Sequence, residues 1–563
     1  MTTGADLLLG AMNDLGVEHV FGLPGTQNVG VFEALRQSRI RTIVATSELA
    51  AGFMANGYAR TSGRVGVLCA IPGPGFTWAM TAIAEARHDS VPLILLTGAP
   101  EGGRPFSLQA LDQQAMIGPV AKGVLRATVP GELATLFCQA HALALEGEPG
   151  PVVIELPDRL LADTAHSPDH QVPRSHGAVS PDDHQWTELV GALQRSTRPL
   201  LMAGQGAAAA PEALLALAER LGAPVATSIS ARGVVPERHP LALAVEPSGP
   251  GIGALNEIAR RADLILVLGW KLSHNGSGGF QLRLPPERMV HVDLAPGVLN
   301  ANYPARLVIR ADVPALLDRL ATVPVSKSTW TIADFEACRG AAGSLEGMVE
   351  PVVNGVTPPT PAGFFQALRA ALPDDGVLSL DSGWHQMLAR RHFRVFSPRG
   401  FLLPTDFQSM GFGIPAAIGA ALAAPKRRVV ALVGDGGFTM SGLELAVAVR
   451  ERVPLTVIVF VDESLGLIRL QQYREFGHEF GTRLERIDLA AFAQAVGASY
   501  LPLAGNAAAT LGEAIQADGV TIVEVSLGDS AGQMKLRAAG AGREAVRAIM
   551  PAGLIARIKR WIR

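Results

Sequence analysis

The feature that most constrains the fold is a repeated alternation between short apolar runs and longer stretches with helical spacing. Each run ends at a turn or at the start of a helical pattern. This rhythm is typical of βαβ units, and it predicts an α/β protein of doubly wound parallel sheets. The clearest runs are RTIVAT (41–46), RVGVLCA (64–70), PLILLTG (92–98), GPVVIELP (150–157), RPLLMAG (198–204), APVATS (223–228), ADLILVLG (262–269), RMVHVDL (288–294), GVLSLDSG (376–383), RRVVALVGDGG (427–437), PLTVIVFVDES (454–464) and GVTIVEVSLGD (519–529).

The runs fall into three groups, separated by two polar stretches. A chain of 563 residues is long enough for roughly three domains. The stretches at 163–183 and 340–360 are rich in turn-forming residues and are interpreted as linkers. The expected domains are 1–165, 186–335 and 361–540, followed by a tail at 541–563.

The overall charge and the cysteines narrow the class of protein. The chain has 48 basic and 51 acidic residues, a balance that does not favour a nucleic-acid partner. Its three cysteines are far apart, which fits buried thiols in a reducing compartment. No apolar run approaches the ~18 residues of a membrane span, and the N-terminus begins without the basic region of a signal peptide. We therefore expect a cytoplasmic enzyme that acts on small molecules.

An acidic glycine turn follows one strand, and a second acid follows the next. Asp435 lies in VGDGG after the run RRVVALV, and Asp462 ends the run PLTVIVFV. Between them, SGLELAVAVRER is expected to form a helix. The carboxyl ends of neighbouring parallel strands share one sheet edge, so the two carboxylates should meet there and could hold Mg²⁺. Alternatively, Asp435 only shapes the turn and Asp462 only caps the next segment.

These residues resemble a known cofactor motif. GDG, with an oxygen ligand 27 positions after its Asp, is similar to the motif that binds thiamine diphosphate (ThDP) in the superfamily of acetohydroxyacid synthase, pyruvate decarboxylase and benzoylformate decarboxylase. The family motif usually ends in Asn-Asn, where this chain has Val461-Asp462. Further blocks resemble the family in the family's order: FGLPGTQN (21–28), ELAAGFMANGYAR (48–60), GPGFTWAMTAIAEARHDSVPLILLTG (73–98), LQALDQ (108–113), SGWHQMLARR (382–391) and SMGFGIPAAIGAALA (409–423).

The resemblance implies a pyrimidine-binding, a central and a diphosphate-binding domain. It also implies that Mg²⁺ is bound by the side chains of Asp435 and Asp462 and by the backbone carbonyl of Ser464. Met410 corresponds to the apolar residue that props the cofactor in its bent shape, and Gln408 would offer its backbone carbonyl to the 4′-amino group. The implied cofactor-binding residues are Gly25, Glu48, Gln408, Met410, Gly434, Asp435, Gly436, Gly437, Asp462, Ser464 and Gly466.

Glu48 is the principal catalytic candidate. By its position alone it could simply complement the dipole of the helix that it begins. In the family, a Glu before this helix contacts the 1′ nitrogen of the aminopyrimidine and so controls removal of the proton from carbon 2 of the thiazolium. Gln109 and Lys122 match positions near the substrate, although either could be an ordinary surface residue.

Departures from the family favour carboligation of a 2-oxo acid with a second carbonyl compound. Ser47 replaces the usual His before Glu48, Thr26 replaces the Asp of simple pyruvate decarboxylases, and their pair of His residues is missing from 108–122. Proton donors for aldehyde release are therefore absent from their expected places, while Phe76, Trp78 and Met410 should form a small dry pocket. The alternatives are a simple 2-oxo acid decarboxylase, a flavin-dependent pyruvate oxidase, a 2-hydroxyacyl-CoA lyase or a catalytically silent scaffold.

The remaining features concern nucleotide, membrane and subunit contacts. Lys271 stands where flavin-containing relatives usually have Arg, so FAD is possible but not expected. His274 and Asn275 could line another nucleotide pocket but are interpreted as a loop. The basic amphipathic tail is interpreted as a lid or a subunit contact, with a membrane surface as the alternative. The family builds each active site from two chains, which implies a homodimer as the minimum and a homotetramer as the expected state.

Overall fold

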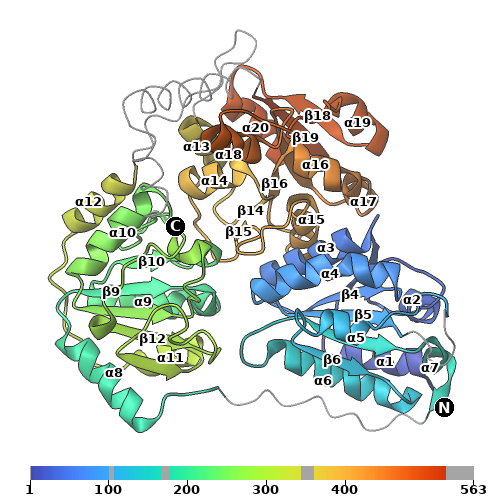
Figure 1. Cartoon of the computed structure of the whole chain (residues 1–563), viewed down its shortest axis with the longest axis horizontal. Helices are drawn as coiled ribbons and strands as arrows, with labels where there is room; N and C mark the ends of the chain where they lie inside the picture. Colours follow the sequence, from blue (N-terminus) through green and yellow to red (C-terminus); the bar gives the residue numbers. More distant parts are fainter. Residues whose placement is uncertain (1, 100–106, 166–177, 344–360, 528–563) are drawn as a thin grey trace.

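The structure, a computed structural model, contains three parallel sheets, each covered by helices (Figure 1). It describes all residues except 1, 100–106, 166–177, 344–360 and 528–563. The predicted tail at 541–563 lies outside the described residues. In the part that is described, no helix is long and apolar enough to cross a membrane.

The N-terminal sheet has six parallel strands in the order β3-β2-β4-β5-β7-β6. Its strands are β2 (His19–Gly22), β3 (Arg41–Val44), β4 (Gly66–Ala70), β5 (Leu93–Gly98), β6 (Gly123–Arg126) and β7 (Val152–Leu156), with a separate antiparallel pair of β1 (Thr2–Thr3) and β8 (Thr164–Ala165). The helices are α1 (Gly4–Asp14), α2 (Val29–Arg36), α3 (Glu48–Ser62), α4 (Pro74–His88), α5 (Gln113–Ile117), α6 (Leu133–Leu145) and α7 (Asp158–Ala162). One face of the sheet packs under α1 and α6, and α3 and α4 cover the other.

The central sheet has five parallel strands in the order β10-β9-β11-β12-β13. The strands are β9 (Pro199–Ala203), β10 (Val225–Thr227), β11 (Leu264–Leu268), β12 (Met289–Asp293) and β13 (Leu307–Arg310). The helices are α8 (Asp183–Arg195), α9 (Pro211–Leu221), α10 (Pro250–Arg261), α11 (Val313–Leu320) and α12 (Ile332–Gly343). Two apolar clusters, one on each face of the sheet, form the core of this domain.

The C-terminal sheet has six parallel strands in the order β15-β14-β16-β17-β19-β18. The strands are β14 (Val377–Leu380), β15 (Phe401–Leu402), β16 (Val429–Gly434), β17 (Leu455–Val461), β18 (Ser499–Pro502) and β19 (Val520–Ser526). The helices are α13 (Pro361–Ala371), α14 (Trp384–His392), α15 (Gly413–Ala423), α16 (Asp435–Ser441), α17 (Leu445–Arg450), α18 (Gly466–Phe476), α19 (Leu489–Val496) and α20 (Ala507–Gln516).

The N-terminal and C-terminal sheets share one apolar cluster, because α3 packs directly against α15 (Figure 1). The two backbones approach closely at small residues. A Cβ atom on Gly57 would lie 2.0 Å from the carbonyl oxygen of Ala416, and one on Gly419 would lie 1.9 Å from that of Met54. This crossing places the start of α3, where Glu48 lies, in a fixed relation to the C-terminal domain of the same chain.

The sequence predictions of fold class and of the main strands are confirmed. One prediction was wrong in detail: the GDGG segment is the first turn of α16, not a separate turn, and the expected helix at 441–452 is a short 3-10 turn followed by α17. As a result, Leu443 points outward with 64% of its surface exposed, whereas Leu445 is buried. The three cysteines are free and buried, as predicted.

Candidate active site

Two acidic residues meet at the carboxyl ends of β16 and β17, as their spacing predicted. The strands pair in register, with Gly434 opposite Phe460. Asp435 then accepts hydrogen bonds across the gap: its Oδ2 lies 3.1 Å from the backbone N of Asp462 and 2.6 Å from that of Glu463. The carboxylate of one strand end is thereby fixed on the backbone of the next.

The two carboxylates stand in a partly buried, anionic environment. Burial raises the pKa of Asp435 above its usual range. Burial, and secondly the neighbouring Asp435 carboxylate, raise the pKa of Asp462 to about 7. A divalent cation would compensate both charges, and carboxylate oxygens are the ligands that Mg²⁺ prefers. The described residues contain no group of three or more His, Cys, Asp or Glu arranged for a metal, so any ion here must take further ligands from the backbone, phosphate or water.

A pocket opens over these two residues and collects most of the predicted cofactor contacts. Its lining includes Met410, Gly434, Asp435, Gly436, Gly437, Asp462, Ser464 and Gly466. Gly466 has to be small here, because a Cβ atom on it would lie 2.4 Å from Asp462 Oδ2. The hydroxyl of Ser464 is buried and has no hydrogen-bond partner among the described residues. The pocket therefore combines carboxylates, an unpaired hydroxyl and a glycine-rich backbone, which suit a metal-bound diphosphate.

His385 also lines this pocket, and the sequence analysis missed it. Its ring is buried near the first turn of α14, and burial lowers its pKa to about 4, so the imidazole is neutral. Its Nε2 has no partner in the described part of the chain. The segment SGWHQM had been recognised as a block without any role for its His. The signal available in the sequence was the pair of Gly383 and His385 shortly after the buried strand β14, which ends at Leu380.

Asp381 is a second residue that sequence reasoning missed, and it holds the turn that carries Met410. Its carboxylate accepts hydrogen bonds from the backbone N–H groups of Gly411 (3.0 Å) and Gly413 (2.9 Å). Burial raises its pKa to about 6, an effect that these hydrogen bonds oppose. On the other side of the turn Gln408 has φ +61°, and its side-chain Oε1 accepts from Ser382 Oγ (3.1 Å). Gln408 and Met410 thus lie on a tightly fixed loop.

Glu48 is buried at the first position of α3. Ser47 caps the helix by accepting a hydrogen bond from Ala50 N (3.2 Å). A Cβ atom on Gly75 would lie 2.7 Å from Glu48 Oε1, so the glycine leaves space for the carboxylate. Just before the helix, Thr46 donates from its backbone N (3.1 Å) and from its hydroxyl to the buried carboxylate of Glu444 in the C-terminal domain.

Other predicted residues of the N-terminal domain lie around the same loops. Gly25 donates its N–H to Asn28 Oδ1 (2.7 Å). Gln109 has φ +57° and packs against Gly73. A Cβ atom added to Gly73 would lie 3.0 Å from the Cβ atom of Gln109. Lys122 directly precedes β6 and therefore lies at the amino-terminal edge of the sheet; its place near the substrate stays a prediction.

One chain brings together only part of the predicted site. Glu48, Gly25 and Gln109 are not among the described residues that line the pocket over Asp435. The expected dry pocket of Phe76, Trp78 and Met410 is not formed within one chain either. Phe76 is completely buried in the core, whereas Trp78 is 59% exposed on α4.

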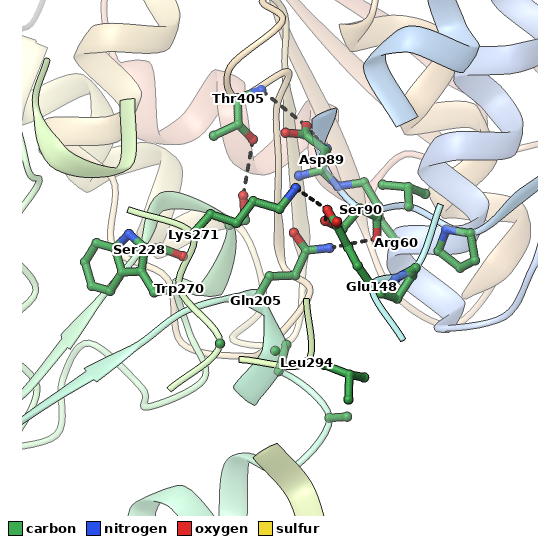
Figure 2. A pocket seen from close by; sticks show the side chains of 18 of the residues that line it. Arg60, Asp89, Ser90, Glu148, Gln205, Ser228, Trp270, Lys271, Leu294 and Thr405 are labelled. Atoms are coloured by element: carbon green, nitrogen blue, oxygen red, sulfur yellow. Dashed lines mark hydrogen bonds and ion pairs between the residues drawn. The ribbon is translucent and has the colours of Figure 1, made fainter. Parts of the chain in front are cut away.

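A second, larger pocket lies where the central domain faces the other two (Figure 2). Lys271 is engaged there, because its Nζ lies 2.7 Å from Glu148 Oε1 and donates to the carbonyl of His88 (2.9 Å). The turn after β9 uses its own amides internally: Gly204 N donates to Leu268 O and Gly206 N donates to Gly269 O. Lys271 is thus paired within the chain, and Arg60 and Arg399 are further cations in the lining of this pocket.

The nearby loop residues follow the interpretation made from the sequence. Asn275 connects to the C-terminal domain, donating from Nδ2 to Thr405 O (2.6 Å) and from its backbone N to Asp406 (3.0 Å). His274 is exposed and contacts the edge of Phe280. The two residues begin a short 3-10 turn, through which Asn275 joins the central domain to the C-terminal domain.

Comparisons with known proteins place these features in a family. The chain matches the N-terminal TPP binding domain of thiamine pyrophosphate enzymes over 2–116, their central domain over 186–320 and their C-terminal TPP binding domain over 381–525. It is 34% identical to a protein of Pseudomonas aeruginosa named "Probable 2-ketoarginine decarboxylase AruI", over 83% of each chain. It is 31% identical to the acetolactate synthase isozyme 1 large subunit of Escherichia coli, over 84% of this chain and 83% of that one. This chain therefore belongs to the thiamine diphosphate-dependent enzymes and has the three α/β domains of that family.

Proposed function

We propose that this enzyme uses ThDP and Mg²⁺ to decarboxylate a 2-oxo acid and to transfer the resulting acyl group to a second carbonyl compound. The observation that carries the proposal is the pair of Asp435 and Asp462, fixed together over a glycine-rich pocket at the ends of adjacent strands. ThDP supplies the electron sink for the carbon–carbon bond that breaks. The protein must bind it, orient it and control its protons.

The C-terminal domain would bind the charged end of the cofactor. The carboxylates of Asp435 and Asp462 and the carbonyl of Ser464 would hold Mg²⁺, and Gly434, Gly436, Gly437 and Gly466 would let the diphosphate approach the backbone. His385 adds a neutral imidazole with an unpaired nitrogen to this pocket. The usual family ligand at position 462 is Asn, so the carboxylate here adds one negative charge and should strengthen the dependence on the metal.

The remaining residues would act at the aminopyrimidine. Glu48 would hold a proton at the 1′ nitrogen, and its burial excludes competing water. The backbone carbonyl of Gln408 would accept from the 4′-amino group, while Met410 supports the bent cofactor. Gly25 and Gln109 would border the ring and the substrate.

A homodimer is proposed as the minimum active unit and a homotetramer as the complete assembly. In a single chain Glu48 does not line the pocket over Asp435, which fits a site that is completed by the Glu48 of a second chain. Large apolar side chains are available for such a contact: Trp78, Met440 and Leu443 are each about 60% exposed, at 59%, 62% and 64%.

Carboligation is favoured over simple aldehyde release by the residues next to Glu48. Ser47, whose oxygen caps the helix, and Thr26 both carry neutral hydroxyls in place of an imidazole or a carboxyl group. Efficient release of an aldehyde requires a proton delivered to the acyl carbon, whereas addition of that carbon to a second carbonyl compound requires a proton only at the acceptor's oxygen. A simple decarboxylase is the second candidate, because the relative from Pseudomonas aeruginosa is named as one.

A substrate panel separates these two functions. The enzyme is incubated with ThDP, Mg²⁺ and either pyruvate or 2-ketoarginine, with and without an added aldehyde or second 2-oxo acid, and CO₂ and products are measured. A carboligase releases CO₂ and forms a hydroxyketone product with the acceptor. Free aldehyde as the main product despite abundant acceptor would establish the decarboxylase instead. An absorption spectrum tests for a flavin in the same preparation.

Two inactive variants test the site and its division between chains. Glu48→Gln should still bind ThDP but exchange the proton of carbon 2 more slowly, whereas Asp435→Ala should lose both metal and cofactor. Asp462→Asn should stay active.

Mixing the two inactive proteins, Glu48→Gln and Asp435→Ala, should restore some activity through hybrid dimers. No recovery after verified subunit exchange would contradict a site shared between chains.

A further inference from the structure

A buried carboxylate of the N-terminal domain reaches the loop of the C-terminal domain that carries Gln408 and Met410. Glu85 lies on α4 and is 0% exposed. Its Oε2 accepts a hydrogen bond from the backbone N of Ser409 (3.1 Å), the residue between Gln408 and Met410. The two partners are 324 positions apart in the chain, so this is a contact between domains.

The same loop is held at three further points, Leu403, Thr405 and Gly411. One helical turn after Glu85, the carboxylate of Asp89 accepts from Thr405 N (3.3 Å) and from Arg60 Nη1 (3.0 Å), as Figure 2 shows. Arg60 also donates to Leu403 O (2.9 Å). On the opposite side, Asp381 accepts from Gly411 N. The segment 403–411 is therefore fixed between buried carboxylates of both domains.

The stability of the folded protein alone does not account for a carboxylate at position 85. Its Oε1 is buried and has no hydrogen-bond partner among the described residues. A buried carboxyl oxygen without a partner destabilises the folded state, and an apolar side chain of similar volume would avoid that effect. Positions that break such a packing rule are expected where a protein positions a functional group.

We propose that Glu85 is a positioning residue, which holds the backbone of Ser409 so that Gln408 and Met410 meet the aminopyrimidine half of ThDP. This inference rests on the proposed function of Gln408 and Met410. In this role Glu85 does not contact the cofactor itself. Loss of its hydrogen bond should loosen the loop and weaken binding of the ring half of ThDP, while the metal and diphosphate pocket remains intact.

The test compares Glu85→Leu, which removes the acceptor, with Glu85→Gln, which keeps one. Glu33→Gln, at an exposed carboxylate on α2, is the matched control. Hydrogen exchange of 403–411 is measured first in the cofactor-free protein. We expect the Ser409 amide to exchange about tenfold faster or more in Glu85→Leu, and close to the wild-type rate in Glu85→Gln and Glu33→Gln. Unchanged exchange in Glu85→Leu would overturn the proposal.

Binding then separates positioning from general damage. The ligands are Mg²⁺ with ThDP and Mg²⁺ with inorganic pyrophosphate. Glu85→Leu should weaken ThDP binding by about tenfold and leave pyrophosphate binding unchanged, and Glu85→Gln should restore ThDP binding. Equal loss of both ligands, or no loss of ThDP binding, would overturn the proposal. If the wild-type protein binds pyrophosphate but not ThDP, the proposed function fails, and the exchange experiment still decides whether Glu85 fixes the loop.

Discussion

The crossing of α3 and α15 predicts that the substitution Gly57→Ala is damaging. A Cβ atom at this position would lie 2.0 Å from Ala416 O and 2.6 Å from the Ala416 carbonyl carbon. Ordinary contacts begin at 3.4 Å, so the helices would have to separate by about 1.4 Å, the difference between these distances. The clash is with backbone, which leaves no flexible side chain to move aside.

The expected effect on stability is a balance of two contributions. Overpacking of this kind destabilises by about 1–3 kcal/mol, and a backbone clash belongs at the upper end. Ala also stabilises a helix by up to about 1 kcal/mol relative to Gly. We therefore expect a net loss of about 2 kcal/mol in the free energy of unfolding. Because Glu48 begins α3, a shift of about 1 Å should also lower kcat by about 100-fold in the folded protein.

Gly10→Ala is the matched control. Gly10 lies within α1, and a Cβ atom there would meet nothing within 4 Å. This substitution should stabilise the protein by up to about 1 kcal/mol and leave activity unchanged. Urea unfolding followed by circular dichroism measures both effects. If Gly57→Ala is as stable and as active as Gly10→Ala, the close approach of the two helices does not exist as described.

Two further predictions concern the metal site and pH. Gly466→Ala places a Cβ atom 2.4 Å from Asp462 Oδ2, so Mg²⁺ binding, titrated together with pyrophosphate, should weaken by about tenfold or more; unchanged binding would contradict the proposed ligand. Burial, and secondly the Asp89 carboxylate, raise the pKa of Glu85 to about 7 from 4.5, although hydrogen bonds from Ser409 and the Arg60 charge oppose this shift. The folded protein then binds a proton that the unfolded chain has lost, so the free energy of unfolding should fall as pH rises from 4.5 to about 7. Urea unfolding across this range should show a smaller fall for Glu85→Gln, and identical slopes would refute the assignment.

The sequence predicted the features that depend on local pattern and missed those that depend on packing. Apolar runs such as PLTVIVFV are buried strands because only a parallel sheet covered on both faces buries them completely. The proximity of Asp435 and Asp462 was predicted because both residues follow neighbouring parallel strands, whose carboxyl ends share one sheet edge. Strand β18, by contrast, is an edge strand with exposed positions and gives no such run. Leu443, within the expected helix at 441–452, is exposed because α17 begins only after a 3-10 turn.

The missed site residues share a physical reason. Asp381 and His385 are single polar side chains whose importance comes from burial and from partners on other elements, and periodicity records neither. Asp381 follows a strand end as Asp435 does, but only the folded chain shows that it holds Gly411 and Gly413. For Lys122, a matching position in the sequence likewise does not determine which edge of the sheet the residue occupies, and the structure places it directly before β6.

The link between Thr46 and Glu444 adds a consequence for the proposed dimer. Glu444 lies in the C-terminal domain, directly before α17, and its buried carboxylate holds the residue two positions before Glu48 in the same chain. Each Glu48 is thus positioned by the domain that binds the cofactor of one site, while it would act on the cofactor of the other. A shift in one diphosphate-binding domain would therefore be transmitted to the catalytic carboxylate of the opposite site. The two sites of the proposed dimer should for this reason not be independent of each other.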